Sequence, residues 1–63
     1  MKFTIKELRR AKGISQEDMA EYCGVHINTY RAWEDKPSEI KLSMAKKIAD
    51  RFGIGIEDVD FLP

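Results

Sequence analysis

The most informative part of the sequence is the stretch Gln16–Glu34, which reads QEDMAEYCGVHINTYRAWE. Apolar residues recur at three- and four-residue spacing on both sides of Gly24, which predicts two short helices. The link Cys23–Val25 is too short for antiparallel packing, so we expect the two helices to cross at a steep angle. Gly24 provides the positive φ that a sharp turn requires. The apolar residues expected on the inner face of this pair are Met19, Cys23, Val25, Tyr30 and Trp33.

Capping signals predict where the neighbouring helices begin and end. Thr4 and Glu7 have the spacing of a capping box, and Gly13 is placed to end the helix that follows. Ser15 is expected to begin the next helix in the same way, with acidic residues in its first turn. Pro37 prevents the helix before it from continuing, because proline disfavours helical backbone in the preceding residue.

Two more helices are expected after Pro37. The longer one has an apolar stripe and ends at Gly53, and the last one, around Ile56–Phe61, is short. The stripe consists of Leu42, Ala45, Ile48, Ala49 and Phe52. No stretch alternates with period two, so we expect no strand. The sequence therefore predicts an all-α fold, a compact domain of five helices over residues 1–63 with a helix-turn-helix at about 16–34.

Composition limits the class of protein. The chain has 63 residues, of which 43% are hydrophobic and 35% are charged, as in a small globular domain. The single cysteine, Cys23, excludes an internal disulfide, and with the one histidine, His26, it cannot complete a four-ligand zinc site. No apolar run is long enough to span a membrane and none resembles a signal peptide, so we expect a cytoplasmic protein.

Motifs of catalysis and cofactor binding are absent from the sequence. There is no Gly-x-Ser-x-Gly, no P-loop and no cluster of metal ligands, so we expect neither an enzyme nor a bound cofactor. Gly53-Ile54-Gly55 matches only the first half of a dinucleotide fingerprint, and nothing before it reads as a strand. Two glycines that end one helix and open another explain the match better. With no ligand-sensing domain in the sequence, no small-molecule ligand is expected.

Charge is balanced overall but unevenly distributed along the chain. There are 11 basic and 11 acidic residues, and a net charge of zero on average disfavours a nucleic-acid binder. Basic residues are in excess in 1–12 and 36–51, whereas acidic residues are in excess in 13–35 and near the C-terminus. Such segregation can reflect only solvated faces. Beside a helix-turn-helix, we favour a basic rim that contacts phosphates.

From Ile5 to about Val59 the chain resembles the Cro/lambda-repressor-like (XRE-type) helix-turn-helix regulators. The resemblance is carried by Glu7-Leu8-Arg9, Gly13-Ile14-Ser15-Gln16-Glu17, Ala20, Gly24-Val25, Trp33-Glu34, Ile48-Ala49 and Phe52-Gly53-Ile54. It implies a five-helix DNA-binding domain, usually dimeric, of the kind found in phage repressors and bacterial regulators. The chain departs from the family pattern at Tyr30, 35–37, Gly55 and His26, which stands where Ser or Thr usually caps the recognition helix.

The resemblance also implies roles for individual residues. Gln16 would contact a phosphate from the N-terminus of its helix, and Arg9 and Glu34 would form a partly buried ion pair. Outward residues of the recognition helix would read bases, since Asn matches adenine, and Thr or an apolar side chain can pack on a thymine methyl. These are Ile27, Asn28, Thr29, Arg31 and Ala32. Arg31 could reach either a guanine or a phosphate. Further phosphate contacts are expected at Lys6, His26, Lys36 and Lys41.

Two functions from different classes stay open. The first is a sequence-specific transcriptional regulator of Cro-like or phage-repressor type, which reads the major groove of double-stranded DNA with the helix after His26. The second is a protein-interaction module on the same scaffold, such as an antitoxin-like or anti-repressor partner binder, which zero net charge slightly favours. Outward Asn28, Thr29 and Arg31 favour DNA, because a protein interface would be richer in aromatic residues.

The C-terminal segment is more apolar than a chain end requires. Some of its residues are needed to close the core beneath the fourth helix, but Phe61 and Leu62 exceed that need. We therefore expect a homodimer, at least on DNA, with recognition helices about 34 Å apart, one turn of B-DNA. The residues concerned are Ile54, Ile56, Val59, Phe61 and Leu62.

Overall fold

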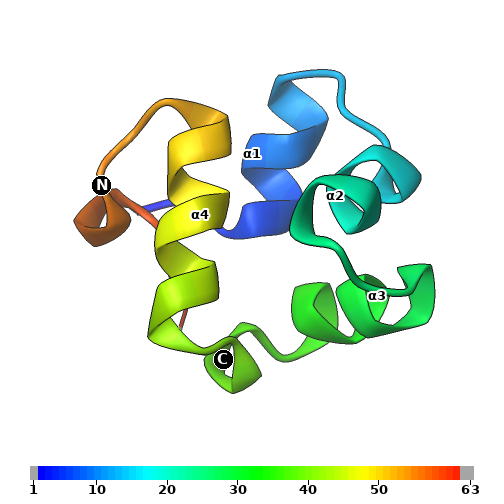
Figure 1. Ribbon diagram of the computed structural model, residues 1–63. Coiled ribbons are helices and arrows are strands. Elements are labelled where there is room, and N and C mark those ends of the chain that lie inside the picture. The colour runs from blue at the N-terminus through cyan, green and yellow to red at the C-terminus, as the bar shows by residue number, and fades with distance from the viewer. Residues whose placement is uncertain (1, 62–63) are drawn as a thin grey trace.

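Helices form most of the chain, as Figure 1 shows for the computed structural model, which describes residues 2–61. The α-helices are α1 (Ile5–Ala11), α2 (Gln16–Cys23), α3 (Ile27–Asp35) and α4 (Leu42–Phe52). Two single 3-10 turns, η1 (Pro37–Glu39) and η2 (Ile56–Asp58), follow α3 and α4. The all-helical class is confirmed. The predicted count of five helices is not, because the described residues contain four α-helices and these two turns.

The predicted fifth helix is replaced by η2 because the chain leaves helical geometry at Val59. Val59 has extended backbone angles and forms an isolated parallel bridge with Phe3. The Phe3 amide donates to the Asp58 carbonyl at 3.2 Å, and the Asp60 amide donates to the Phe3 carbonyl at 2.8 Å. These bonds to the N-terminal segment take the place of the helical bonds that would have continued η2. The described residues contain no strand beyond this bridge.

Side-chain caps set the starts of α1 and α2. The Thr4 hydroxyl accepts from the Glu7 amide at 3.1 Å, and the Glu7 carboxylate accepts from the Thr4 amide at 2.9 Å, so the predicted capping box is present. The Ser15 hydroxyl accepts from the Asp18 amide at 3.0 Å. α2 ends at Gly24, whose φ of 72° is left-handed, as predicted for a sharp turn into α3.

The core lies where α1, α2 and α4 meet the inner side of α3. Figure 1 shows α4 upright on one side of the molecule, with α3 crossing the base of the view below α2. Tyr30 is fully buried, whereas Trp33 is half-buried and meets the Tyr30 ring edge-on at 6.3 Å between centroids. The buried core residues are Ile5, Met19, Ala20, Cys23, Tyr30, Ala45, Ile48, Ala49, Phe52 and Val59.

Leu42 does not belong to the core, and its predicted place in the inner stripe of α4 is wrong. It is 66% exposed, because it lies in the first turn of α4, before the buried part of the helix begins at Ala45. Ile40 and Met44 pack against the core near this end of the helix instead. The remainder of the predicted stripe is buried.

Candidate functional site

The outer face of α3 carries the residues expected to read bases. Asn28, Thr29, Arg31 and Ala32 are exposed, while Tyr30 on the opposite side is fully buried. Ile27 differs from them, since it is half-buried and packs against the core. The exposed face is therefore formed by four of the five expected residues. It presents one amide, one hydroxyl, one guanidinium and one methyl group.

His26 caps the start of α3. Its Nδ1 accepts a hydrogen bond from the Asn28 amide at 3.1 Å, although the imidazole ring is otherwise exposed. The ring thus takes the place of the Ser or Thr that is usual in the family. This bond satisfies one of the amides at the helix N-terminus that have no partner within the helix.

An ion pair joins the end of α3 to α1. Arg9 Nε donates to Glu34 Oε2 at 2.6 Å, Arg9 Nη2 donates to Glu34 Oε1 at 3.3 Å, and Arg9 Nη1 donates to the Ile14 carbonyl at 2.9 Å. The Glu34 side chain is only 2% exposed and that of Arg9 is 11% exposed. The structure brings together the two residues that the family resemblance pairs. Their bidentate geometry holds α1 against the far end of α3.

The surroundings of this pair fix the charges of both partners. Burial alone would raise the pKa of Glu34, but hydrogen bonds from Arg9 and Gln16 outweigh it, and the net pKa is lowered from its ordinary value. The hydrogen bond to Glu34 raises the pKa of Arg9. Burial also raises the pKa of the nearby Tyr30 phenol, and the Glu34 carboxylate raises it further. Glu34 is therefore ionised at neutral pH, beside a neutral phenol.

Gln16 extends the ion pair to the outer face of α3. Its Nε2 donates to Glu34 Oε1 at 2.9 Å, and its Oε1 accepts from Arg31 Nε at 3.2 Å. The sequence alone does not predict this link. The available signal is the three-residue spacing of Arg31 and Glu34, which places both side chains on one side of α3. Gln16, at the first position of α2, lies between them.

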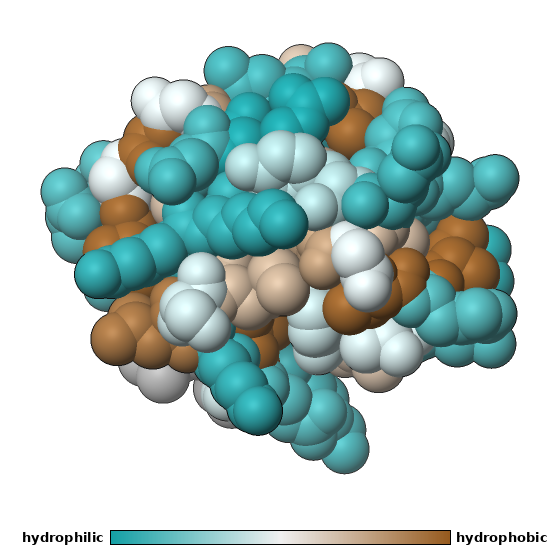
Figure 2. Space-filling model, in the orientation of Figure 1, coloured by the Kyte–Doolittle hydropathy of each residue, from teal (hydrophilic) through white to brown (hydrophobic). Residues whose placement is uncertain are grey.

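The other residues expected to contact phosphates are all exposed. Lys6 is on α1, His26 precedes α3, and Lys36 and Lys41 lie on either side of η1. Hydrophilic side chains cover most of the face shown in Figure 2, with hydrophobic residues visible between them. The basic residues thus surround α3 in the chain, without making the molecule as a whole basic.

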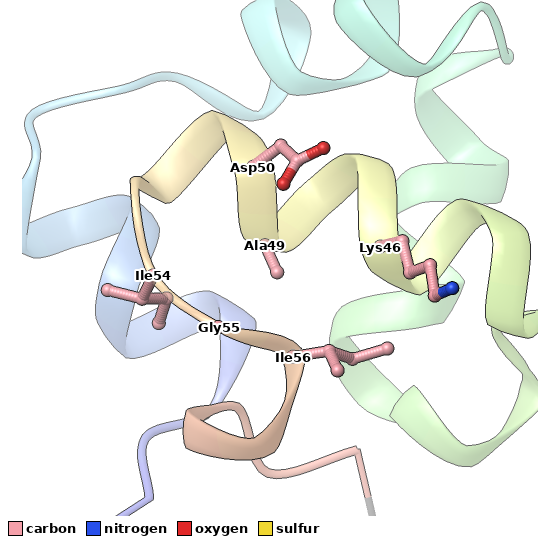
Figure 3. A pocket seen from close by; sticks show the side chains of 6 residues that line it. All are labelled: Lys46, Ala49, Asp50, Ile54, Gly55 and Ile56. Atoms are coloured by element: carbon pink, nitrogen blue, oxygen red, sulfur yellow. The ribbon is translucent and has the colours of Figure 1, made fainter.

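A pocket of about 220 Å³ lies away from α3, between α4 and the segment that follows it. In Figure 3, Ala49 points from α4 toward the backbone of Gly55, with Ile54 and Ile56 on either side. Lys46 and Asp50 of α4 complete the lining. The pocket is formed in part by the segment expected to dimerise.

Burial in that segment is graded. Val59 is part of the core, whereas Ile54, Ile56 and Phe61 are half-buried and pack against its edge. Two of these half-buried residues, Ile54 and Ile56, line the pocket itself. Leu62, the remaining residue of the expected dimer contact, lies outside the described residues.

Within residues 2–61, no group of three or more His, Cys, Asp or Glu side chains could hold a metal ion. No helix among these residues has the length and apolar character needed to cross a membrane.

Comparisons with known proteins give a consistent family. Residues 5–59 match the family described as Helix-turn-helix. The uncharacterized HTH-type transcriptional regulator MJ0272 of Methanocaldococcus jannaschii is 39% identical over 59 residues, which cover 94% of this chain and 89% of that protein. The uncharacterized HTH-type transcriptional regulator YgzD of Bacillus subtilis is 40% identical over 62 residues, covering 98% and 94%.

A phage protein is also similar. The cryptic phage CTXphi transcriptional repressor RstR of Vibrio cholerae is 34% identical over 55 residues, which cover 87% of this chain. They cover 50% of RstR, so this chain spans about half the length of that relative. No solved structure gives a significant match.

Proposed function

This chain belongs to the XRE-type helix-turn-helix family, and from that premise we propose that it is a transcriptional regulator that reads the major groove of double-stranded DNA with α3. The observation that carries the proposal is the exposed polar face of α3 opposite the fully buried Tyr30. In this motif the second helix enters the groove and its N-terminal residues reach the base edges.

The base contacts follow from the chemistry of that face. Asn28 has the paired donor and acceptor that match adenine N6 and N7, and Arg31 can donate two bonds to guanine. Thr29 and Ala32 can pack on a thymine methyl. Ile27 can add an apolar contact only with the part of its side chain that the core leaves exposed.

Phosphate contacts would hold the motif in place on the duplex. Lys6, Lys36 and Lys41 provide ammonium groups, and His26 and Gln16 lie at the starts of α3 and α2. Because these groups meet the backbone of either strand whatever its sequence, they add affinity without adding specificity.

A repressor is the form of regulator that we favour, of Cro-like or phage type. The family includes such proteins, and the similarity to RstR, whose name describes a phage transcriptional repressor, supports this choice. Two copies would bind together, with the segment from Ile54 to Leu62 between them, since half-buried Ile54, Ile56 and Phe61 offer apolar surface there.

Binding to the DNA upstream of the protein's own gene tests the proposal. A gel shift at low salt is expected to give a defined complex that resists unlabelled competitor of unrelated sequence. Lys36→Ala should weaken binding to specific and unrelated duplexes alike and reduce the salt dependence, because one phosphate contact is lost. No shift even at low salt would count against DNA binding.

A protein-interaction module is the second candidate, and one observation favours it. The net charge is zero, so counterion release on DNA would be modest. Stoichiometric capture of a partner protein, together with the absence of any gel shift, would favour this candidate over the regulator.

A further inference from the structure

The orientation of the Gln16 amide is fixed by the groups around it. Glu34 is ionised and buried, so its oxygens can only accept hydrogen bonds. The Gln16 group that faces Glu34 at 2.9 Å must therefore be the amide NH₂, and the amide oxygen must face away from the carboxylate. Arg9 holds the carboxylate itself in place with two hydrogen bonds.

The outward-facing oxygen of Gln16 meets a group that can only donate. Arg31 Nε donates to it at 3.2 Å. This bond uses the inner edge of the guanidinium and leaves its two terminal nitrogens, which have no hydrogen-bond partner within residues 2–61, on an exposed residue. A chain of hydrogen bonds thus runs from Arg9 through Glu34 and Gln16 to Arg31.

We propose that Gln16 is a positioning residue that holds Arg31 so that its two terminal nitrogens face guanine O6 and N7, which makes Arg31 a specificity-determining residue. The proposal rests on the proposed function and gives Gln16 a role beyond a phosphate contact. Arg31 lies three residues from Asn28 and so shares its exposed face of α3. A guanidinium fork also fits a phosphate, and the experiment separates these two acceptors.

Holding Arg31 in the free protein has a physical benefit. A free arginine side chain loses rotamer entropy when it is fixed on a ligand. A side chain already restrained by Gln16 loses less of this on binding, so more of the guanine contact appears as affinity for the preferred sequence.

The first test measures the free protein. NMR of the arginine Nε–H groups should show a restrained Arg31 in the wild type and a mobile Arg31 in Gln16→Met, which keeps the size of the side chain but not its hydrogen bonds. Arg10, whose side chain has no hydrogen-bond partner within residues 2–61, is the control and should be mobile in both proteins. An Arg31 signal equally mobile in wild type and variant would overturn the positioning role.

The second test measures base preference on randomised duplexes. Arg31→Ala should reduce the preference for guanine at one position roughly tenfold. Gln16→Met should weaken the preference at that same position, and the double variant should lose little more than Arg31→Ala alone. Lys41→Ala is the matched control. It should weaken binding to all duplexes alike and add its effect independently to that of Arg31→Ala.

Two results would overturn the proposal while leaving DNA binding intact. Arg31→Ala could weaken all sequences equally, which would assign Arg31 to a phosphate. Gln16→Met could also weaken binding to all sequences equally, with a loss of affinity that adds fully to the loss in Arg31→Ala. That result would assign Gln16 to a phosphate alone. A wild-type protein that binds no duplex would overturn the proposed function as well, and the NMR result would still report whether Gln16 restrains Arg31.

Discussion

Among single residues, Glu34 is the side chain of α3 that accepts hydrogen bonds from both α1 and α2. Its carboxylate accepts from Arg9 and Gln16, and it is 2% exposed. Removing it in Glu34→Ala leaves the buried Arg9 guanidinium without its anion, which we expect to cost about 3 kcal/mol. A domain of this size is stable by only about 3–5 kcal/mol, so the variant should be close to unfolding at 25 °C. Urea denaturation followed by circular dichroism measures the loss.

Asp35→Ala is the matched control for that prediction. Asp35 is the neighbouring carboxylate, exposed at the last position of α3. An acid there is unfavourable to the helix dipole, so its removal should leave the urea midpoint unchanged or slightly higher. If Glu34→Ala and Asp35→Ala have the same midpoint, the ion pair contributes no more than an exposed pair, about 0–1 kcal/mol.

The lowered pKa of Glu34 also makes the stability of the protein depend on pH. The pKa of Glu34 is lower in the folded protein than its ordinary value of 4.5, so the folded state binds the proton less tightly than the unfolded chain. Its contribution is present in full above that ordinary value and is lost as the pH falls through the lower pKa of the folded state. Urea midpoints measured from about pH 6 to about pH 3 should fall more steeply for wild type than for Glu34→Gln. Parallel curves for the two proteins would contradict this.

Asn28 is the residue of α3 expected to contact an adenine in the DNA. It is exposed on α3, and only its backbone amide is used in the His26 cap. Asn28→Ala should weaken binding to the preferred duplex by about 1–3 kcal/mol and relax the choice at one base pair. The stability of the protein should change by less than about 0.5 kcal/mol. Selection on randomised duplexes measures the first effect, and an unchanged base preference with full affinity would exclude a reading role.

The sequence predicts which side of a helix a residue occupies better than it predicts hydrogen bonds and ion pairs between helices. Inward Tyr30 and outward Asn28 follow from helical spacing alone. Arg9 and Glu34 are paired in advance only by family resemblance, because they come from helices far apart in the sequence. The hydrogen bond between Gln16 and Arg31 depends on how close the start of α2 lies to the outer side of α3. The periodicity of apolar residues within one helix does not predict that distance.

Among the elements, α3 has an unusual start whose contribution can be measured. His26 Nδ1 accepts from the Asn28 amide, as a Ser or Thr oxygen does at other helix starts. His26→Ala removes this acceptor and should destabilise the protein by about 1 kcal/mol, whereas His26→Ser supplies another one and should not. Urea denaturation of the three proteins is the measurement. Equal stability of His26→Ala and wild type would mean that the cap contributes nothing.

Element boundaries follow from the sequence wherever a local signal sets them. Thr4, Ser15 and Gly24 act through neighbours in the chain, and the structure places helix ends at each of them. The two errors arise from contacts beyond the local sequence. Leu42 follows the apolar spacing of α4 but lies outside the contact with the other helices, and Val59 is drawn out of a helix by its bridge to Phe3.

At the scale of the whole molecule, size bears on the expected dimer. The backbone extends 28 Å along its longest axis, whereas recognition helices one turn of B-DNA apart are separated by about 34 Å, so mainly side chains would meet between two protomers. Two such molecules can share only a small contact, so we expect a dimer that is weak in solution and forms on DNA. Ultracentrifugation with and without the bound duplex should show two protomers per duplex and mainly monomer without it.

Variants at two apolar residues locate the contact. Phe61→Ala should raise the concentration needed for the second protomer to bind, while Leu42→Ala, an exposed apolar residue outside the expected contact segment, should not. One protomer per duplex at saturation would rule the dimer out, and equal effects of both variants would place the contact elsewhere.

The bridge between Phe3 and Val59 closes a loop of more than fifty residues by backbone hydrogen bonds, in a chain whose single cysteine cannot form an internal disulfide. It joins positions separated by nearly the whole sequence, so forming it costs more loop-closure entropy than any turn between neighbouring helices. Two backbone hydrogen bonds and one buried valine offset that cost, with the help of the packed helices between them. The bridge between Phe3 and Val59 is therefore the contact of the domain that should open most easily. Fraying is expected to begin there, while α2 and α3 keep the crossing that the turn at Gly24 sets.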